Sequence, residues 1–210
     1  NVPEIIYWNL DKHYLSDLAT KDINIPATLF IKKGEQQNLK TIFKQSHWTR
    51  AVLKPAIAGA ARETFMITQA NYTDYEDDFQ RLTTKESMLL QEFQNNIVLK
   101  GEMSLIMIDG KYTHAVLKKA KVGDFRVQDD FGGSVEIYHP KRDEISFAEK
   151  AISACPQPPI YGRVDIFYDN KNQLALGELE LIEPELWFRN HPKAANNLAE
   201  AVCNFIANSF

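Results

Sequence analysis

Cysteine, long apolar runs and basic segments are all scarce in this 210-residue sequence, and each scarcity argues against a class of protein. Two cysteines, Cys155 and Cys203, cannot build a disulfide framework, which favours a reducing cytoplasmic compartment. The apolar runs are too short to cross a bilayer, so no membrane partner is expected. A net charge of −4 without a basic arm argues against nucleic acid as a partner.

Several catalytic signatures are also missing. The sequence contains no HExxH, CxxC or GxxxxGK[ST] motif, and no Ser–His–Asp order of the kind that builds a nucleophilic triad. Zinc chemistry and nucleophilic catalysis are therefore poor predictions for this chain.

The order of predicted elements indicates an α+β protein with two lobes. Strands and helices are interleaved without regular βαβ spacing. The sequence predicts lobes at residues 1–93 and 94–210, with a hinge at Gln94–Asn96. Periodicity and turn residues predict strands at Ala27–Lys32, Arg50–Pro55, Glu63–Thr68, Ser87–Phe93, Gly101–Asp109 and Lys111–Lys119. They predict helices at Leu10–Ala19 (capped by Asn9), Leu39–His47, Thr73–Leu82, Ser146–Ser153 and Lys193–Asn208.

A late hairpin carries the most informative acids. Tyr161–Tyr168 and Leu174–Ile182 read as strands joined by a turn. Side chains two apart share a strand face, so Glu178 and Glu180 point the same way, and Asp165 can lie opposite them. Three converging carboxylates repel one another unless a cation lies between them, and hard oxygen ligands without a histidine cluster suggest Mg²⁺. The alternative, that these acids form the solvated face of a hairpin, stays open.

Other polar residues could join such a site. The candidates are cationic (Lys12, Lys54, Lys118, Arg126) or acidic (Glu102, Glu183). Fixed lysines and a carboxylate-bound metal suit a nucleoside triphosphate. Each also has a structural reading: Lys12 would be a solvated helix residue, Lys118 half of a charged strand end, and Arg126 a partner of Asp124. Lys54 is the strongest candidate, because it ends an apolar strand beside Pro55 and a loop of small residues.

Six segments in order resemble the ATP-grasp superfamily, in particular its glutathione-synthetase-like, RimK-like and cycloserine-biosynthesis ligases. They read WNLDKHYL, PATLF, VLKPAIAGAARET, LLQEFQNNI with GEMS, HAVLKKA with GDFRVQ and GG, and YGRVD with GELELIEPELW. The resemblance implies two α+β lobes gripping ATP between them, with the metal held by the second lobe. An N-terminal substrate domain, usual in these families, is expected to be absent from this chain.

The resemblance also implies residue roles. Lys12 and Lys54 look like the phosphate-contacting lysines, and Gln91, Glu92 and Phe93 like the strand that meets adenine. Asn96 stands where relatives often have an acid for the ribose, and Glu102 is a further cofactor-site neighbour. Lys118 and Arg126 resemble the catalytic pair that faces the transferred phosphate. Asp165, Glu178 and Glu180 resemble the Mg²⁺ ligands, which would also accept Mn²⁺. Two departures from the common pattern are Glu180, in place of Asn, and the loop Ala58–Ala61, in place of Ser-x-Gly-Gly.

The implied function is a carboxylate–amine ligase. A small-molecule carboxylate would attack the γ-phosphate of MgATP, and an amine would displace phosphate from the resulting acyl phosphate. The alternatives are a nucleotide-binding module or a partner subunit without ligase activity. The apolar C-terminal helix offers a surface for a homo-oligomer.

Overall fold

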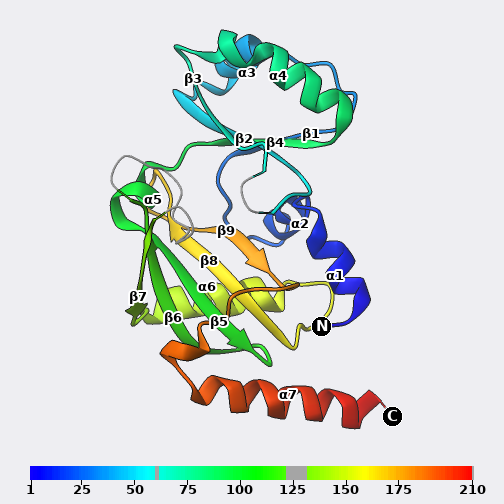
Figure 1. Ribbon diagram of the computed structural model, residues 1–210, viewed down its shortest axis with the longest axis vertical. Coiled ribbons are helices and arrows are strands. Elements are labelled where there is room, and N and C mark those ends of the chain that lie inside the picture. The colour runs from blue at the N-terminus through cyan, green and yellow to red at the C-terminus, as the bar shows by residue number, and fades with distance from the viewer. Residues whose placement is uncertain (60–61, 122–131, 210) are drawn as a thin grey trace. The chain divides into compact units, whose positions relative to one another are not determined.

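The computed structural model describes residues 1–59, 62–121 and 132–209, and these divide into two compact units (Figure 1). The large unit comprises Asn1–Leu10, Tyr14–Ile25 and Gln94–Phe210. The small unit comprises Asp11–His13 and Pro26–Phe93. Each unit is built around an antiparallel sheet with its own helices, so the chain is an α+β protein, as predicted.

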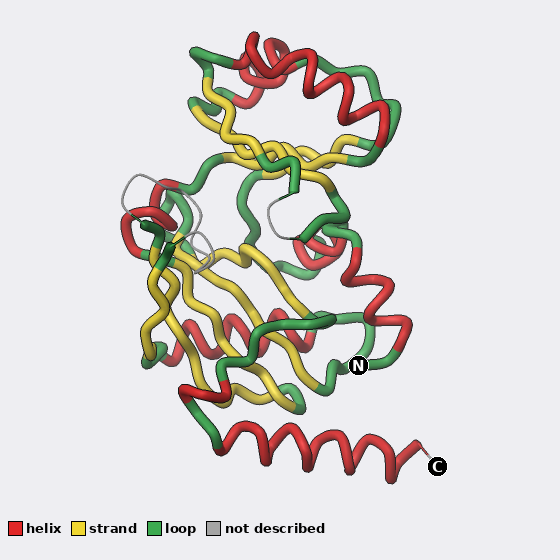
Figure 2. Tube along the Cα trace, viewed as in Figure 1, coloured by secondary structure: helices red, strands yellow, loops and turns green. Residues whose placement is uncertain are grey.

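The small unit is a four-stranded sheet covered on one face by two helices. Its strands run in the order β1-β4-β2-β3, and Figure 2 shows both helices on the same side of them. The elements are β1 (Thr28–Ile31), α3 (Leu39–Ser46), β2 (Arg50–Pro55), β3 (Phe65–Thr68), α4 (Tyr72–Lys85) and β4 (Met88–Glu92). Alternate strand residues such as Leu53 and Leu90 pack with Phe43 and Phe79 of the helices into one buried cluster.

The large unit is a five-stranded sheet in the order β7-β6-β5-β8-β9. Its strands are β5 (Glu102–Ile108), β6 (Lys111–Lys119), β7 (Ser134–Tyr138), β8 (Tyr161–Tyr168) and β9 (Leu174–Glu180), and its helices are α1 (Pro3–Leu10), α2 (Tyr14–Ala19), α5 (Asn95–Lys100), α6 (Arg142–Ser153), the 3₁₀ turn η2 (Phe188–Asn190) and α7 (Lys193–Ser209).

Helices α6 and α7 pack on opposite faces of this sheet. Gly162, the partner of Met107 on β5, faces Ile152 of α6: a Cβ added there would lie 3.4 Å from Ile152 and 2.5 Å from the Leu181 side chain. Ile106 and Ile108 point to the other face, where they form a buried cluster with Trp187 and Ala194 of the C-terminal segment. The face that α7 covers at one end carries the polar residues described below at the other.

The N-terminal helix differs from its prediction. A single helix over Leu10–Ala19 was expected, whereas α1 and α2 are separate and Asp11–His13 between them belongs to the small unit. Asn9 does not cap a helix. Its buried amide donates to the Leu179 carbonyl at 2.8 Å and accepts from the Leu181 N–H at 2.9 Å.

Side chains from the N-terminal segment thereby satisfy the outer edge of β9. The Tyr14 hydroxyl accepts from the Leu179 N–H at 2.9 Å, and Asn24 contacts the backbone of Leu174 and Leu176. These bonds replace the neighbouring strand that an edge strand lacks. They also explain why residues 1–10 and 14–25 group with the large unit, whereas the predicted lobe of residues 1–93 places them with the small one.

Three further elements differ from the sequence-based expectations. Helix α5 begins at Asn95, within the segment expected to be a hinge, and strand β7 was not predicted. Helix α6 begins at Arg142, four residues before the expected start. None of the described helices is both long and apolar enough to cross a membrane.

The edge bonds of Asn9 generate a stability prediction. Asn9→Ala leaves the Leu179 carbonyl and the Leu181 N–H buried without these partners. We expect a loss of roughly 2 to 4 kcal/mol in the free energy of unfolding, measured by urea denaturation. Asn196→Ala, which truncates an exposed asparagine of α7, is the matched control and should change stability by less than about 0.5 kcal/mol. Equal effects of the two substitutions would contradict the edge role.

Candidate functional site

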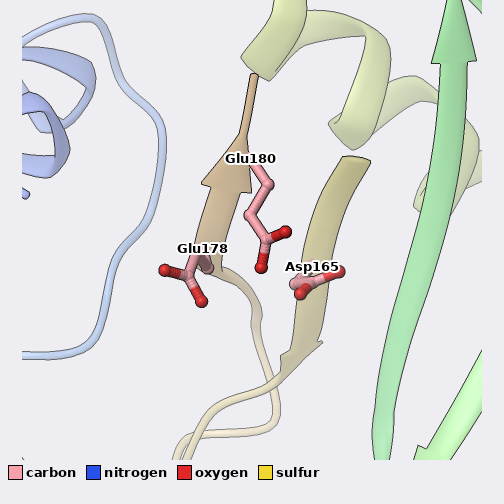
Figure 3. A group of neighbouring side chains, drawn as sticks. All are labelled: Asp165, Glu178 and Glu180. Atoms are coloured by element: carbon pink, nitrogen blue, oxygen red, sulfur yellow. The ribbon is translucent and has the colours of Figure 1, made fainter. Parts of the chain in front are cut away.

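Three acids gather on the hairpin of β8 and β9. Asp165 pairs in register with Glu178, and Glu180 lies two residues further along β9 on the same face. Ligand oxygens of the three side chains all lie within 4.8 Å of one another. In Figure 3 the Glu180 carboxylate lies between those of Glu178 and Asp165. The structure therefore brings together the three acids that the sequence singled out.

Asp165 is the most buried member and is surrounded by donors. Its Oδ1 accepts from the Ser104 hydroxyl at 2.6 Å and from Arg163 Nε at 2.9 Å. Its Oδ2 accepts from Lys118 Nζ at 2.9 Å and from an Arg163 terminal nitrogen at 2.8 Å. Burial opposes ionisation of this carboxyl, but Arg163 and Lys118 outweigh burial and hold its pKa well below the usual range. Asp165 is thus a buried carboxylate with all four of its acceptor positions in use.

Lys118 joins Asp165 to a second acid. It pairs across the β5–β6 ladder with Glu102, whose Oε2 lies 2.6 Å from Lys118 Nζ. Burial lowers the pKa of Lys118, but Asp165 and then Glu102 more than offset this and the net shift is upward. Burial raises the pKa of Glu102 despite Lys118. The predicted catalytic lysine is therefore a buried cation fixed between two acids.

The surroundings of Glu180 disfavour its ionised form. Burial and the charge of Asp165 raise its pKa to about 8, although Arg163 donates a hydrogen bond to Glu180 Oε1 and opposes the shift. A carboxyl with a pKa this high gains from any further positive charge beside it. The all-oxygen set of Asp165, Glu178 and Glu180 fits a hard divalent ion, provided that Asp165 exchanges one of its present hydrogen bonds.

A bulge in the hairpin sets the position of Glu178. The register shifts between Asp165 and Ile166, so that Gly177 of β9 is the extra residue. A Cβ added to Gly177 would lie 2.9 Å from a Glu102 oxygen and 3.0 Å from the Phe167 ring. A side chain at this position would displace the Glu102 carboxylate or the Phe167 ring, because β9 passes directly against them.

The two predicted phosphate lysines belong to the small unit. Lys12 lies in the Asp11–His13 segment rather than on a helix. Its backbone N–H donates to the Ala56 carbonyl at 2.9 Å, and its Nζ donates to the Ala58 carbonyl at 2.8 Å. Lys54 is the penultimate residue of β2, and its Nζ donates to Gln91 Oε1 at 3.3 Å. Both lysines thus adjoin the turn that follows β2.

The predicted adenine strand is β4 with its C-terminal neighbour. The Gln91 amide donates to Thr28 Oγ1 at 2.9 Å, and the backbone N–H groups of Glu92 and Phe93 donate to the carbonyls of Ala27 and Arg50. The Phe93 ring also lies 4.3 Å from the Arg50 guanidinium carbon. These contacts fix the strand through its N–H groups.

The two other predicted residues are Asn96 and Arg126. Asn96 belongs to the large unit, where its amide donates to the Asp169 carbonyl at 2.5 Å and so ties α5 to the β8–β9 turn. It does not lie in the same unit as Gln91, Glu92 and Phe93. Arg126 and the end of the Ala58–Ala61 loop lie outside the described residues.

Comparison with known proteins gives this arrangement a family. The sequence profile of the RimK-like ATP-grasp domain matches residues 11–181, which is most of the chain. The chain belongs to the RimK-like ATP-grasp family. The predicted resemblance is thereby confirmed, and membership supports ATP binding and ATP-dependent ligation as the chemistry of the fold.

Individual relatives of this ATP-grasp chain are distant. It is similar to the cycloserine biosynthesis protein DcsG of Streptomyces lavendulae, at 23% identity over 94% of this chain and 70% of that protein. The crystal structure of D-cycloserine synthetase DcsG matches with a TM-score of 0.83 at 23% identity, covering 95% of this chain and 71% of the other. A D-alanine–D-alanine ligase from Bacillus anthracis matches at 0.70 and 15% identity, covering 93% and 66%. At these identities the structures establish the fold.

Sequence reasoning missed Arg163 and Ser104. Arg163 lies two residues before Asp165 on β8, so the strand period alone places it on the face of the acids. Ser104 lies directly opposite Asp165 on β5, a pairing that only the sheet register reveals. Arg163 could have been found from its spacing, whereas Ser104 could not.

The raised pKa of Glu180 predicts a pH-dependent stability. Without divalent ions, the unfolded chain releases this proton near the ordinary pKa of 4.5, and the folded chain keeps it until about 8. The folded state therefore binds more protons in this window, and stability falls as pH rises through it. Glu180→Gln cannot ionise at this position. The Tm of the variant minus the Tm of the wild type should therefore increase as the pH rises from about 5 to about 8.5.

The control for this measurement is Glu149→Gln, which alters an exposed acid of α6. Its Tm difference from the wild type should stay flat over the same range. A Glu180→Gln difference that is equally flat would contradict the raised pKa.

Proposed function

We propose that this ATP-grasp chain carries the ATP-dependent part of a carboxylate–amine ligase that works through an acyl phosphate. The observation that carries the proposal is the acid cluster of Asp165, Glu178 and Glu180, flanked by the buried cations Arg163 and Lys118, on a chain of the RimK-like ATP-grasp family. A fold that binds ATP needs such a set to manage the charge of a triphosphate.

Glu178 and Glu180 are the residues assigned to hold Mg²⁺, or Mn²⁺ in its place, with Asp165 as the third ligand. A bound divalent ion would neutralise charge on the phosphate oxygens as the γ-phosphoryl group is transferred. A cation bound here would favour ionisation of Glu180, whose pKa is raised by burial and then by the charge of Asp165. Lys118 would keep Asp165 and Glu102 in position while Asp165 exchanges one of its hydrogen bonds for the metal ion.

The remaining predicted residues are assigned to the nucleotide. Lys12 and Lys54 would exchange their present carbonyl and amide acceptors for phosphate oxygens, which are stronger acceptors. Gln91, Glu92 and Phe93 would meet the adenine ring. Asn96 and Glu102 are the assignments to the ribose and to the outer part of the cofactor site. Arg126 remains a proposed partner of the transferred phosphate.

The chemical steps follow from these assignments. A substrate carboxylate oxygen attacks the γ-phosphorus of ATP, forming the acyl phosphate and releasing ADP. Lys118 and Arg163 supply fixed positive charge that is already desolvated, so little reorganisation is needed as negative charge moves to the phosphoryl group. An amine then attacks the acyl carbon, loses a proton and expels phosphate, leaving an amide.

The substrates are proposed to be a small-molecule carboxylate and a small-molecule amine in a reducing cytoplasmic setting. The names of the relatives span cycloserine biosynthesis, D-alanine–D-alanine ligation and an ATP-grasp ligase, PsnB, complexed with a precursor peptide. We assign small molecules because DcsG matches with a higher TM-score than PsnB does. Self-association through α7, where Phe205 and Ile206 are exposed, remains a proposal.

A metal-site variant tests the acid assignment. Substituting both Glu178 and Glu180 by Gln removes two carboxyl ligands of the proposed site while preserving side-chain size. We expect isothermal calorimetry to show Mg²⁺-dependent ATP binding weakened at least about 100-fold, because two charged ligands are lost. Glu149→Gln should bind as the wild type does. Unchanged MgATP affinity in a double variant with a native circular dichroism spectrum would exclude the metal assignment.

Trapping of the acyl phosphate tests the reaction itself. The chain is incubated with MgATP, pooled small carboxylates and hydroxylamine, which intercepts acyl phosphates as hydroxamates. We expect ADP and a hydroxamate in equal amounts from at least one pool, measured by mass spectrometry. Tight MgATP binding without ADP from any pool would instead favour a nucleotide-binding module, a reading consistent with the full occupancy of Asp165 by protein donors.

A further inference from the structure

The edges of the Arg163 guanidinium donate hydrogen bonds to acids, and the guanidinium lies over the face of an aromatic ring. Its Nε and a terminal nitrogen donate to Asp165, and a terminal nitrogen also donates to Glu180. The Trp187 ring centroid lies 5.2 Å from the guanidinium carbon, within the range of a cation–π contact. Arg163 is only 8% exposed, so little water separates it from these groups.

The edge contacts are the ones that metal binding would weaken. Asp165 and Glu180 belong to the acid cluster proposed to take a divalent ion, and an acid that shares its charge with Mg²⁺ attracts a guanidinium less. The face contact involves no acid. The cation–π contact between Trp187 and Arg163 therefore does not depend on whether a metal ion is bound.

Trp187 is itself an unusual core residue. It is 4% exposed, and its backbone adopts left-handed dihedrals, with φ 44° and ψ 40°. Its indole N–H is buried and has no hydrogen-bond partner among the described residues. Both features cost stability, and phenylalanine would avoid the unpaired N–H. What indole offers over phenyl is the larger electron-rich face, which attracts cations more strongly.

The C-terminal segment fixes this ring. Trp187 packs with Ile106, Ile108 and Val116 of the sheet and with Ala194 and Ala201 of α7. The residue before it, Leu186, accepts through its carbonyl from His114 Nε2 at 2.9 Å. Helix α7 and the turn before it are thus connected to Arg163 through one side chain.

We propose that Trp187 is a positioning residue of the ligase reaction, which keeps the Arg163 guanidinium in place when the acids of the cluster turn to the metal. This inference rests on the proposed function, because it needs a divalent ion at the acid cluster. It assigns to the C-terminal segment a share in preparing the site, beyond covering the sheet.

The test follows the Arg163 Nε–H signal by ¹⁵N NMR in the full chain, with assignment by its loss in Arg163→Lys. Without metal, Trp187→Leu should keep the signal, because Asp165 still accepts from Nε. With saturating Mg²⁺ and no nucleotide, hydrogen exchange of this N–H should rise about tenfold or more in Trp187→Leu and stay nearly constant in the wild type. Trp187→Phe should give an intermediate rise.

Fluorinated tryptophan serves where truncation disturbs folding. In a Trp8→Phe, Trp48→Phe background, Trp187 is the only tryptophan left. Fluorination preserves the shape of the ring but removes electron density from its face, so exchange with Mg²⁺ should quicken with each added fluorine. Ile108→Ala opens a cavity in the same cluster at a residue whose strand partner is Tyr161 rather than Arg163. It controls for loosened packing and should leave the exchange rate unchanged.

The outcomes separate the two proposals. Normal Mg²⁺ binding by calorimetry, with Arg163 exchange in Trp187→Leu and the fluorinated chains equal to the wild type, would overturn the positioning role and leave the metal site intact. A rise in Ile108→Ala as large as in Trp187→Leu would also overturn it. No Mg²⁺ binding by the wild-type chain would overturn the metal assignment and this inference with it.

Discussion

The fold of the large unit depends on the pairing of a buried carboxylate, Asp165, with two cations. Asp165 is buried on β8, between β5 and β9, and a carboxylate there would be strongly disfavoured if Arg163 and Lys118 did not pair with it. The cations in turn need the outer acids, Glu102 and Glu180, to share their charge. Four strands must be in register for this network to exist, so the polar residues and the sheet specify one another.

The network also supports the proposed metal site. Within it, positive and negative charges are not evenly matched, and the excess negative charge falls on the Glu178–Glu180 side of the hairpin, where burial and Asp165 keep the pKa of Glu180 high. Asp165 already accepts hydrogen bonds at all of its acceptor positions, whereas ionisation of Glu180 is disfavoured. A further cation beside Glu180 would therefore favour its ionised form. At the Gly177 bulge, β9 passes close to Glu102, the acid that pairs with Lys118.

Local patterns in the sequence predicted a substantial part of this arrangement. The period of two along β9 placed Glu178 and Glu180 on one face, and turn residues set the hairpin that brings Asp165 opposite. Strands β2 and β4 of the small unit also lie close to their predicted ranges, because β2 is buried at every second residue and β4 is a short buried apolar run. The α1–α2 region was misjudged because Asn9 has the residue type of a helix cap, while its actual partners on β9 lie about 170 residues away.

The sequence by itself determined which residue types are available and which side chains share a strand face, because both follow from composition and from the geometry of an extended backbone. Only the tertiary structure decided that Lys118 and Ser104 meet Asp165, that Lys12 lies outside a helix, and that Trp187 lies over Arg163. Those contacts join segments far apart in the chain. Their formation depends on strand order and register, which no local pattern encodes.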